Sequence, residues 1–429
     1  MDKLFQVAVL LCLFGLIDFY AFQGIKAATD SFSPSTQRIL HIVYWSFTGL
    51  TFLAILGYNF LPIKWLSPGI RTSLMVYIFS NLLAKIILVL FVLLDDIIRF
   101  FKWIGSLFTS TDTIPSAVSE PETAPIAQAV ESTISRSQFL NQVGVIAATT
   151  PVVAISWGII SGAHDYRVRK KTISLKSLPK SFDGIKIAQI SDIHSGSFWN
   201  RTAVKGGVEM LMNEKPDMVF FTGDLVNNVA TEMKDYVDVF GKVAAPLGVF
   251  SVLGNHDYGD YVAWPSEGAK QKNLQDLIAI HRAMGWDILI DEHRILEESG
   301  EKLAVLGIGN WGAKARFPKY GQLQLAHAGT QDISTKLLLS HDPSHWRAQV
   351  LPEYPDIDLM LSGHTHGMQF GVEIGDFKWS PVQYVYDEWA DLYQAGEQYL
   401  YVNRGFGYLA MPGRIGMPPE ITILELKRA

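Results

Sequence analysis

The second half of the chain carries five short polar strings, each placed directly after an apolar run. The apolar runs have the length and composition of buried strands, and they are residues 185–191, 218–222, 249–253, 337–339 and 359–361. The polar residues that follow them are Asp192, His194, Asp224, Asn255, His256, Asp257, His341, His364 and His366. Imidazole, carboxylate and amide groups are ligands of divalent transition metals. Strand ends that present this set together predict a two-metal centre, which activates water for attack on phosphorus.

The spacing within the strings supports a shared site. Asp192 and His194 are two residues apart on an extended segment, so their side chains can lean the same way. His364 and His366 repeat this spacing, and a glycine on each side of the pair lets the backbone turn tightly. A single Asp or His after a strand more often satisfies a loop backbone. The ordered repetition, and not any one residue, therefore indicates a metal site.

The strings occur in the order DxH, GD, GNHD, H and GHxH, and this series resembles the calcineurin-like metallophosphoesterase superfamily. The resemblance covers residues 168–429 and is strongest at the first, third and last strings. Residues 401–407 also resemble the membrane-associated bacterial branch of that superfamily. Met368 departs from the branch, which often has a glycine there, but this departure removes no ligand. The resemblance implies a four-layer α/β/β/α sandwich.

The resemblance also implies which residue holds which metal. The implied ligands are Asp192, His194 and His366 for the first metal, Asn255, His341 and His364 for the second, and Asp224 as a bridge. Such ligands suit two divalent ions of manganese, iron, zinc or cobalt. No thiolate is expected to take part, because the single cysteine, Cys12, lies in a distant apolar segment.

Two further residues receive catalytic roles from the resemblance. A hydroxide shared by the metals would be the nucleophile, because metal coordination brings the pKa of water near neutrality. His256 would protonate the leaving oxygen, and Asp257 would accept the other ring hydrogen and fix the orientation of the ring. The alternative for His256 is a loop histidine without a catalytic part. Arg404 either meets a phosphate or caps the sheet, and His345 is interpreted as supporting or structural.

The N-terminal part of the chain has the pattern of a membrane protein. Three apolar runs, residues 4–22, 39–61 and 74–94, are each long enough to cross a bilayer as a helix. They predict three transmembrane spans within residues 1–108 and a fourth, less apolar span at residues 138–163. Asp18 and Lys85 lie inside the runs, and the cost of charge in lipid predicts that both face the bundle interior. Their roles stay open.

Residues 109–137 are rich in Ser, Thr, Pro, Ala and Glu, which predicts a flexible polar linker. Basic residues flank the spans on both sides, so the positive-inside rule favours a cytoplasmic catalytic domain only narrowly. A string at residues 135–140 resembles a decayed twin-arginine export signal and favours the opposite side. We expect a multi-pass protein of the cell membrane with its catalytic domain in the cytoplasm.

The remaining residues, 168–429, suffice for one catalytic domain. Helical patterns at residues 203–214 and 274–284 alternate with the strands, and residues 400–403 and 421–426 predict two more strands. Alternation of this kind predicts an α/β fold with its site at the carboxyl ends of the strands. The net charge is −6 and no basic stripe is present, so we expect no nucleic-acid partner.

These features predict an integral-membrane, binuclear metal-dependent phosphoesterase that hydrolyses a phosphomonoester, phosphodiester or pyrophosphate. A catalytic domain tethered to a bilayer meets lipid-borne groups at high effective concentration, which favours a lipid-linked substrate. Loops around Trp264 and Trp311 are expected to meet the lipid. The alternative is a non-catalytic membrane scaffold or sensor that uses the same fold for binding. The complete ligand set favours the enzyme, because a retired site usually loses ligands.

Overall fold

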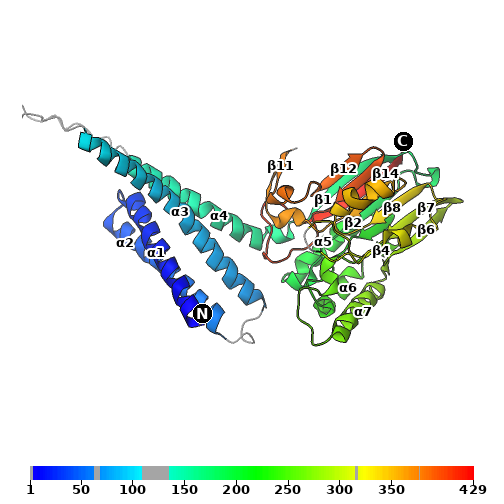
Figure 1. Cartoon of the computed structure of the whole chain (residues 1–429), viewed down its shortest axis with the longest axis horizontal. Coiled ribbons are helices and arrows are strands. Elements are labelled where there is room, and N and C mark those ends of the chain that lie inside the picture. Colours follow the sequence, from blue (N-terminus) through cyan, green and yellow to red (C-terminus); the bar gives the residue numbers. More distant parts are fainter. Residues whose placement is uncertain (1–2, 62–67, 109–134, 315–316, 376) are drawn as a thin grey trace, which may run out of the picture. The chain divides into compact units, whose positions relative to one another are not determined.

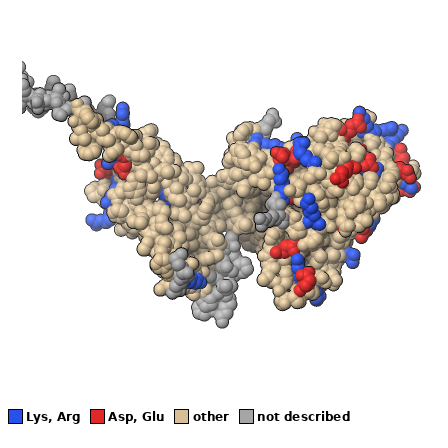
Figure 2. Space-filling model, in the orientation of Figure 1, with Lys and Arg blue, Asp and Glu red and all other residues tan. Residues whose placement is uncertain are grey.

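The computed structural model describes residues 3–61, 68–108, 135–314, 317–375 and 377–429. The chain forms two compact units, Met1–Ser156 and Trp157–Ala429. Uncharged side chains dominate the visible surface of the first, helical unit, whereas Lys, Arg, Asp and Glu are spread over the second unit (Figure 2). This difference in surface chemistry separates a part suited to lipid from a part suited to water.

The first unit is built from long apolar helices (Figure 1). Their bounds are α1 Lys3–Thr29, α2 Pro34–Phe60, α3 Pro68–Phe108 and α4 Arg136–Ile160. Among the described residues, these four helices are long and apolar enough to cross a membrane. Helix α4 starts at Arg136, two residues before the predicted start of the fourth span at residue 138, because the Ser135 hydroxyl accepts the N–H of Gln138 at 3.1 Å and caps the first turn. Linker residues 109–134 lie outside the described residues.

Asp18 and Lys85 are both buried inside the helical unit, as the sequence predicts, and the structure adds that they pair. Asp18 on α1 is fully buried, Lys85 on α3 is nearly so, and the two form an ion pair. Lys85 Nζ also donates to the Thr48 hydroxyl at 3.1 Å, and the Tyr44 hydroxyl donates to the Asp18 carbonyl at 2.7 Å. The charges are therefore compensated by partners from three helices.

The second unit holds two six-stranded mixed sheets among its described residues. The first has the order β1-β14-β2-β3-β4-β5, with bounds Arg167–Leu175, Glu420–Arg428, Lys186–Ile190, Met218–Phe221, Val249–Ser251 and Asp287–Ile288. The second has the order β12-β13-β9-β8-β7-β6, with bounds Asp391–Ala395, Gln398–Val402, Leu359–Ser362, Thr335–Leu339, Glu301–Gly307 and Glu292–Glu298. A separate hairpin pairs β10 (Val372–Ile374) with β11 (Phe377–Trp379).

The two sheets face each other across a buried core to which Phe220 of β3 and Leu337 of β8 contribute. Helices α5 (Arg201–Asn213), α6 (Val237–Phe240) and α7 (Glu267–Ala283) cover the outer face of the first sheet. Helix α8 (Leu323–His327) and the turns at residues 346–353 cover the outer face of the second. The predicted four-layer α/β/β/α sandwich is confirmed.

The fold positions the predicted polar strings at one place. Strands β2, β3 and β4 run parallel, and so do β8 and β9 in the second sheet. Each of these five strands ends within a few residues of one polar string. Because parallel strands bring their carboxyl ends to one edge of a sheet, the strings of each sheet converge at that edge.

Candidate metal centre

The loops after the strands adopt strained backbone conformations. Asp192, His194, Asp224, His364 and His366 all have positive φ, between 47° and 72°. Non-glycine residues rarely adopt this conformation, and such strain gathers at functional sites. Hydrogen bonds between the loops hold it, since Asp192 N–H donates to Gly223 O at 2.9 Å and Gly363 N–H donates to His341 O at 2.9 Å. The loops therefore fix one another, with their side chains directed into a common space.

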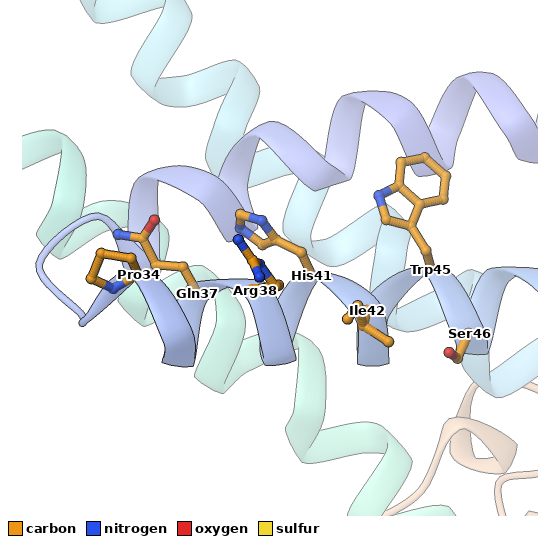
Figure 3. Close-up of a pocket in the computed structure, with 7 residues that line it drawn as sticks. All are labelled: Pro34, Gln37, Arg38, His41, Ile42, Trp45 and Ser46. Atoms are coloured by element: carbon orange, nitrogen blue, oxygen red, sulfur yellow. The ribbon is translucent and has the colours of Figure 1, made fainter.

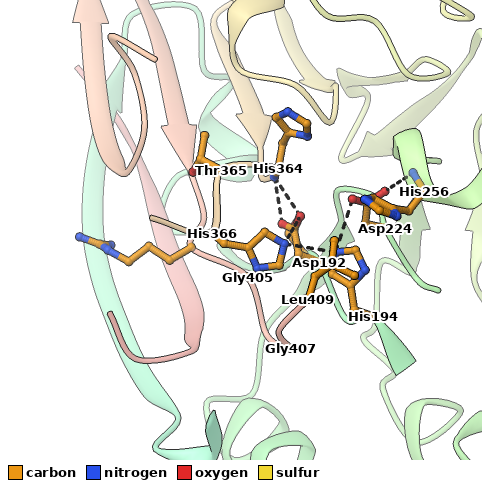
Figure 4. Close-up of polar contacts among 12 residues, drawn as sticks. Asp192, His194, Asp224, His256, His364, Thr365, His366, Gly405, Gly407 and Leu409 are labelled. Carbon is orange, nitrogen blue, oxygen red and sulfur yellow. Dashed lines mark hydrogen bonds and ion pairs between the residues drawn. The ribbon is translucent and has the colours of Figure 1, made fainter. Parts of the chain in front are cut away.

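Asp192, His194 and His366 form the first of two ligand groups among the described residues. The Nε2 atoms of His194 and His366 are 3.2 Å apart, and Asp192 Oδ1 lies 3.2 Å from His366 Nε2 (Figure 4). Ligands at the ~2.1 Å bond lengths of a transition metal are spaced by roughly this distance. The geometry of this group therefore suits one divalent ion.

Asp224, His341 and His364 form the second group. Asp224 Oδ2 lies 3.1 Å from His341 Nε2, and it also lies 3.5 Å from His194 Nε2 of the first group. Asn255 joins the second group, because its Oδ1 lies 2.9 Å from His364 Nδ1. The carboxylate of Asp224 thus stands between the groups, in the position that a bridging ligand needs.

The two ring nitrogens of His341 indicate that a proton or a metal ion belongs in the site. A carbonyl only accepts, so His341 Nδ1 donates to Thr222 O at 2.7 Å. The lone pair of Nε2 in the neutral ring then faces the Asp224 carboxylate, and Nε2 has no hydrogen-bond partner among the described residues. Two buried acceptors that face each other repel unless a proton or a metal ion lies between them. The site residues therefore fit the metal ions that the sequence predicts.

The charge balance of the site gives the same result. Burial lowers the pKa of His341, but the carboxylates of Asp224 and Asp192 outweigh burial and raise it to about 10. Without metal, a proton must supply the positive charge that these carboxylates require. A divalent ion supplies this charge equally well.

Asp192 also ties the first string to the last. The N–H of His364 donates to both carboxylate oxygens of Asp192, each at 3.0 Å. Gly363 makes this approach possible, because a Cβ at this position would lie 1.9 Å from Ser191 Oγ and 2.2 Å from Asp192 Oδ2. Only glycine therefore fits at position 363, the first residue of the GHTHG string.

His256 lines the cavity beside both groups. Its Nδ1 donates to the carbonyl of Asn227 at 2.7 Å, and its backbone N–H donates to Asp224 Oδ1 at 2.9 Å. The ring lies against Tyr261, with ring centroids 4.5 Å apart. Because Nδ1 is engaged, Nε2 is the ring nitrogen that can exchange a proton with a substrate.

The predicted hydrogen bond from His256 to Asp257 is wrong. Asp257 lies in a short 3₁₀ turn, Asn255–Tyr258, and its buried carboxylate accepts backbone N–H groups. The donors are Asp224 at 2.9 Å, Leu225 at 2.8 Å, Val226 at 3.2 Å and Gly254 at 2.9 Å. Burial and the neighbouring Asp224 charge raise the pKa of Asp257 to about 7. Asp257 therefore joins two ligand loops, and the Asn227 carbonyl orients the ring of His256.

Two supporting residues escape the sequence patterns. The Tyr386 hydroxyl lies 2.9 Å from His364 Nε2, so it can fix the tautomer of that ring. The fully buried Arg414 donates to Gly407 O at 2.6 Å and to Arg404 O at 2.8 Å, and it lies 3.3 Å from His366 Nδ1. Both residues lie in irregular segments, where no strand-end pattern marks them.

Arg404 and His345 are both buried and paired with neighbouring side chains. Arg404 is fully buried and donates to Glu420 at 2.6 Å and to both oxygens of Asp391 at 2.9 and 2.8 Å. It therefore joins β12 of one sheet to β14 of the other, which agrees with the structural alternative. His345 pairs with Ser340 Oγ at 3.0 Å and with Gln349 Oε1 at 3.0 Å.

A cavity of about 210 Å³ opens onto the ligand groups. Its lining is His194, Asp224, Asn255, His256, Tyr261, Phe317, His364, His366 and Leu409. Polar ligands form the floor, whereas Tyr261, Phe317 and Leu409 add aromatic and apolar surface. The cavity therefore suits a phosphoryl group attached to a partly apolar substituent.

A larger hollow of about 620 Å³ lies on α2, along Pro34, Gln37, Arg38, His41, Ile42, Trp45 and Ser46 (Figure 3). It contains none of the predicted ligands. Because α2 is a candidate membrane span, we expect this lining to face lipid, and we assign it no part in the chemistry.

Comparisons with known proteins agree with these observations. Residues 185–368 match the model of the family "Calcineurin-like phosphoesterase". Residues 3–163 match "Probable Calcineurin-like phosphoesterase, transmembrane domain".

Similar proteins occur in bacteria and animals. "Uncharacterized metallophosphoesterase YkuE" of Bacillus subtilis is 31% identical over 307 residues, which are 68% of this chain and 98% of that protein. "Transmembrane protein with metallophosphoesterase domain" of Danio rerio is 29% identical over 310 residues, or 71% of this chain and 66% of that protein. "Phosphodiesterase YaeI" of Escherichia coli is 26% identical over 298 residues, or 68% of this chain and 99% of that protein.

Proposed function

Because the chain belongs to the calcineurin-like metallophosphoesterases and carries a transmembrane domain ahead of the catalytic fold, we propose that it hydrolyses a phosphoester at the two ligand groups. The observation that carries this proposal is Asp224, whose carboxylate lies within 3.5 Å of a histidine Nε2 in each group. A carboxylate shared in this way can span two ions roughly 3.5–4 Å apart. The substrate class comprises phosphomonoesters, phosphodiesters and pyrophosphates.

The chain's own residues divide the work of the reaction. Asp192, His194 and His366 would hold one ion, Asn255, His341 and His364 the other, and Asp224 both. When bound, divalent manganese, iron, zinc or cobalt supplies charge for the phosphoryl oxygens and an activated water. His256 would transfer a proton to the leaving oxygen through Nε2, because its Nδ1 is engaged by Asn227 O. Asp257 keeps the loops of Asp224 and Asn255 in register.

A lipid-linked phosphoester is the substrate that we favour. The membrane domain keeps the site near a bilayer, and the aromatic and apolar cavity lining tolerates an apolar substituent. The tryptophans expected to meet lipid are both half-buried in their own domain. Trp264 donates its indole N–H to Gly259 O at 2.7 Å, and the Trp311 ring packs at a tilted angle against His345. Both rings keep exposed surface, so their contact with a lipid stays a prediction.

The direct test uses the full chain in lipid nanodiscs. We expect hydrolysis of p-nitrophenyl phosphate or bis-p-nitrophenyl phosphate with added manganese, loss of hydrolysis on chelation, and recovery when metal is restored. Metal binding without turnover on any phosphoester would favour the scaffold or sensor instead. Comparing lipids in cells that carry the parent or the Asp224→Asn variant then tests the lipid-linked substrate. An accumulated soluble phosphoester beside unchanged lipids would contradict it.

We also propose that the catalytic unit faces the cytoplasm. Arg167, Arg169, Lys170 and Lys171 follow the last membrane helix directly, and basic residues beside a span favour the cytoplasmic side. A C-terminal fusion to green fluorescent protein should then fluoresce, and a fusion to alkaline phosphatase should be inactive. An active alkaline phosphatase fusion would place the unit outside.

A further inference from the structure

The β10–β11 hairpin has its polar face inward and its apolar face outward. In register, Ile374 pairs with Phe377 and Glu373 pairs with Lys378, so the two pairs lie on opposite faces of the hairpin. The carboxylate of Glu373 accepts hydrogen bonds from both terminal nitrogens of Arg169 on β1, at 2.7 and 2.6 Å. Lys378 donates to Asp391 on β12 at 2.8 Å. The charged face thus binds the edges of both sheets, and the apolar face is left to the surroundings.

The outward apolar surface is extensive. Ile374 is 72% exposed and Phe377 is 61% exposed. The turn after the hairpin adds Tyr384 at 76% and Val385 at 54%. Phe370, just before the hairpin, and Val372 of β10 are also exposed. We call these six residues the hairpin surface. Clustered exposed side chains of this kind mark an interaction surface with protein or membrane.

The membrane exit of the chain is bonded to the base of this hairpin. In the last turn of α4, Gly158 O accepts the N–H of Arg414 at 3.1 Å, and Trp157 is 69% exposed. One residue further on, Ile415 O accepts the N–H of Gly371 at 2.9 Å, and Ile415 N–H donates to Gln369 O at 2.8 Å. A short backbone path therefore runs from α4 through residues 414–415 to the start of β10.

The close approach along this path depends on glycines. A Cβ on Gly162 would lie 2.1 Å from Arg414 O, and a Cβ on Gly413 would lie 2.5 Å from Gly158 O. The two backbones are therefore in direct contact. Trp157 lies near the C-terminal end of the candidate span Arg136–His164, and tryptophan is enriched at membrane–water interfaces. The base of the hairpin is thus bonded to the end of a candidate span.

Residues 384–389, which follow the hairpin, contact the loop of the GHTHG string at the metal site. Thr365 Oγ1 donates to Trp389 O at 2.7 Å, and the Tyr386 hydroxyl lies 2.9 Å from His364 Nε2. Tyr386 directly follows the exposed Tyr384 and Val385. The segment thus has one side on a predicted metal ligand and the other side apolar and exposed.

We infer that the hairpin surface rests in the lipid bilayer that α4 crosses, and that it holds the entrance of the metal site at the lipid headgroups. The inward ion pairs explain how charged strands tolerate this position, since their charges are neutralised by Arg169 and Asp391. The inference does not require hydrolysis, so an inactive protein would still test it.

The test is site-directed spin labelling of the full chain in nanodiscs of phosphatidylcholine and phosphatidylglycerol. Cys12 is the single cysteine and is exposed, so Cys12→Ser provides a background for Ile374→Cys and Phe377→Cys. Nitroxides at both positions should show several-fold higher collision rates with oxygen and several-fold lower rates with a water-soluble nickel chelate than the control. The matched control is Ile295→Cys, an exposed apolar position on strand β6.

Two results would overturn the inference. Equal nickel-chelate accessibility at positions 374, 377 and 295 would show that the hairpin surface faces water. Dipolar broadening between labels on different chains would show that a second copy covers it. Thermal melting temperatures equal to that of the Cys12→Ser parent establish that the labelled proteins are folded.

Discussion

At the scale of single residues, the position of each ring proton decides what the site can do. His341 and His256 both donate Nδ1–H to a backbone carbonyl, that of Thr222 and of Asn227, at 2.7 Å in each case. Both Nε2 atoms are thereby left for chemistry. The sequence shows which residues can serve as ligands or acids. It does not show these hydrogen-bond partners, because any residue of another loop can supply a backbone carbonyl. The misassigned role of Asp257 has the same origin.

Replacing His256 should separate proton transfer from metal binding. His256→Gln should retain metal and lose about 10²–10⁴-fold in kcat on an alkyl phosphoester, whose leaving group needs a proton. The loss on a p-nitrophenyl ester should be smaller, because nitrophenolate leaves without one. His327→Gln, a partly exposed histidine paired with Asp356, is the control and should change neither rate. An equal loss on both esters would contradict the acid role.

Replacing Tyr386 should weaken the second metal site without removing a ligand. Tyr386→Phe removes the hydroxyl 2.9 Å from His364 Nε2, and loss of such a supporting bond costs about 10–100-fold in metal affinity. The activity at saturating manganese should stay near that of the parent. The neighbouring exposed Tyr384→Phe is the control, and manganese titration of activity is the measurement. Unchanged manganese dependence would show that Tyr386 does not position His364.

At the scale of elements, apolar runs in the sequence predicted the strands that carry the site, but they did not predict the edge strands β1 and β6. Strands β2, β3, β4, β8 and β9 are buried on both faces along almost their whole length, so most of their residues are apolar. Strand β1 begins with Arg167, and β6 carries Glu292 and Glu298, because edge strands keep partial contact with water. Mixed charge and short length hide such strands from a periodicity argument.

A buried histidine on helix α7 should make the stability of the second unit depend on pH. His281 is fully buried, its Nδ1 lies 3.0 Å from Ser251 Oγ, and burial lowers its pKa from 6.5 to about 3. Between pH 6.5 and pH 3, His281 is therefore protonated in the unfolded chain and neutral in the folded chain. The free energy of unfolding should fall as pH drops from 6.5 toward 3, by about 1.4 kcal/mol per pH unit from this group.

His281→Gln should lessen that slope, because glutamine does not titrate. Denaturant unfolding of the detergent-solubilised protein at pH 7 and pH 5 measures it, with the partly exposed His327→Gln as control. The same pH slope in the parent and in His281→Gln would contradict the burial argument.

The ion pair between α1 and α3 should matter for the helical unit. Asp18→Asn leaves the buried Lys85 without its counter-charge, and breaking a buried pair costs about 3–5 kcal/mol. Adding Lys85→Met should restore most of the lost stability. Melting temperatures in detergent measure both, with the exposed Asp30→Asn as control. An unchanged melting temperature in Asp18→Asn would show that the pair contributes little.

At the scale of the whole molecule, the chain joins a lipid-suited helical unit to a water-suited catalytic unit. Both were predictable, because apolar runs and metal-ligand strings are local in sequence. The attachment of the hairpin was not, since the Arg169–Glu373 pair joins residues 204 positions apart. Long-range pairs of this kind place the site entrance, and they appear only once the chain is folded.

The central claim is that Asp224 holds two metal ions for phosphoester hydrolysis, and metal analysis of one variant tests it most directly. The parent, loaded with manganese and desalted, should carry two ions per chain and hydrolyse an aryl phosphoester. Asp224→Asn should lose both ions and the activity together, because its carboxylate lies within 3.5 Å of both groups. The surface variant Asp276→Asn should match the parent. Full metal content and turnover in Asp224→Asn, or a parent that binds no metal, would contradict the account.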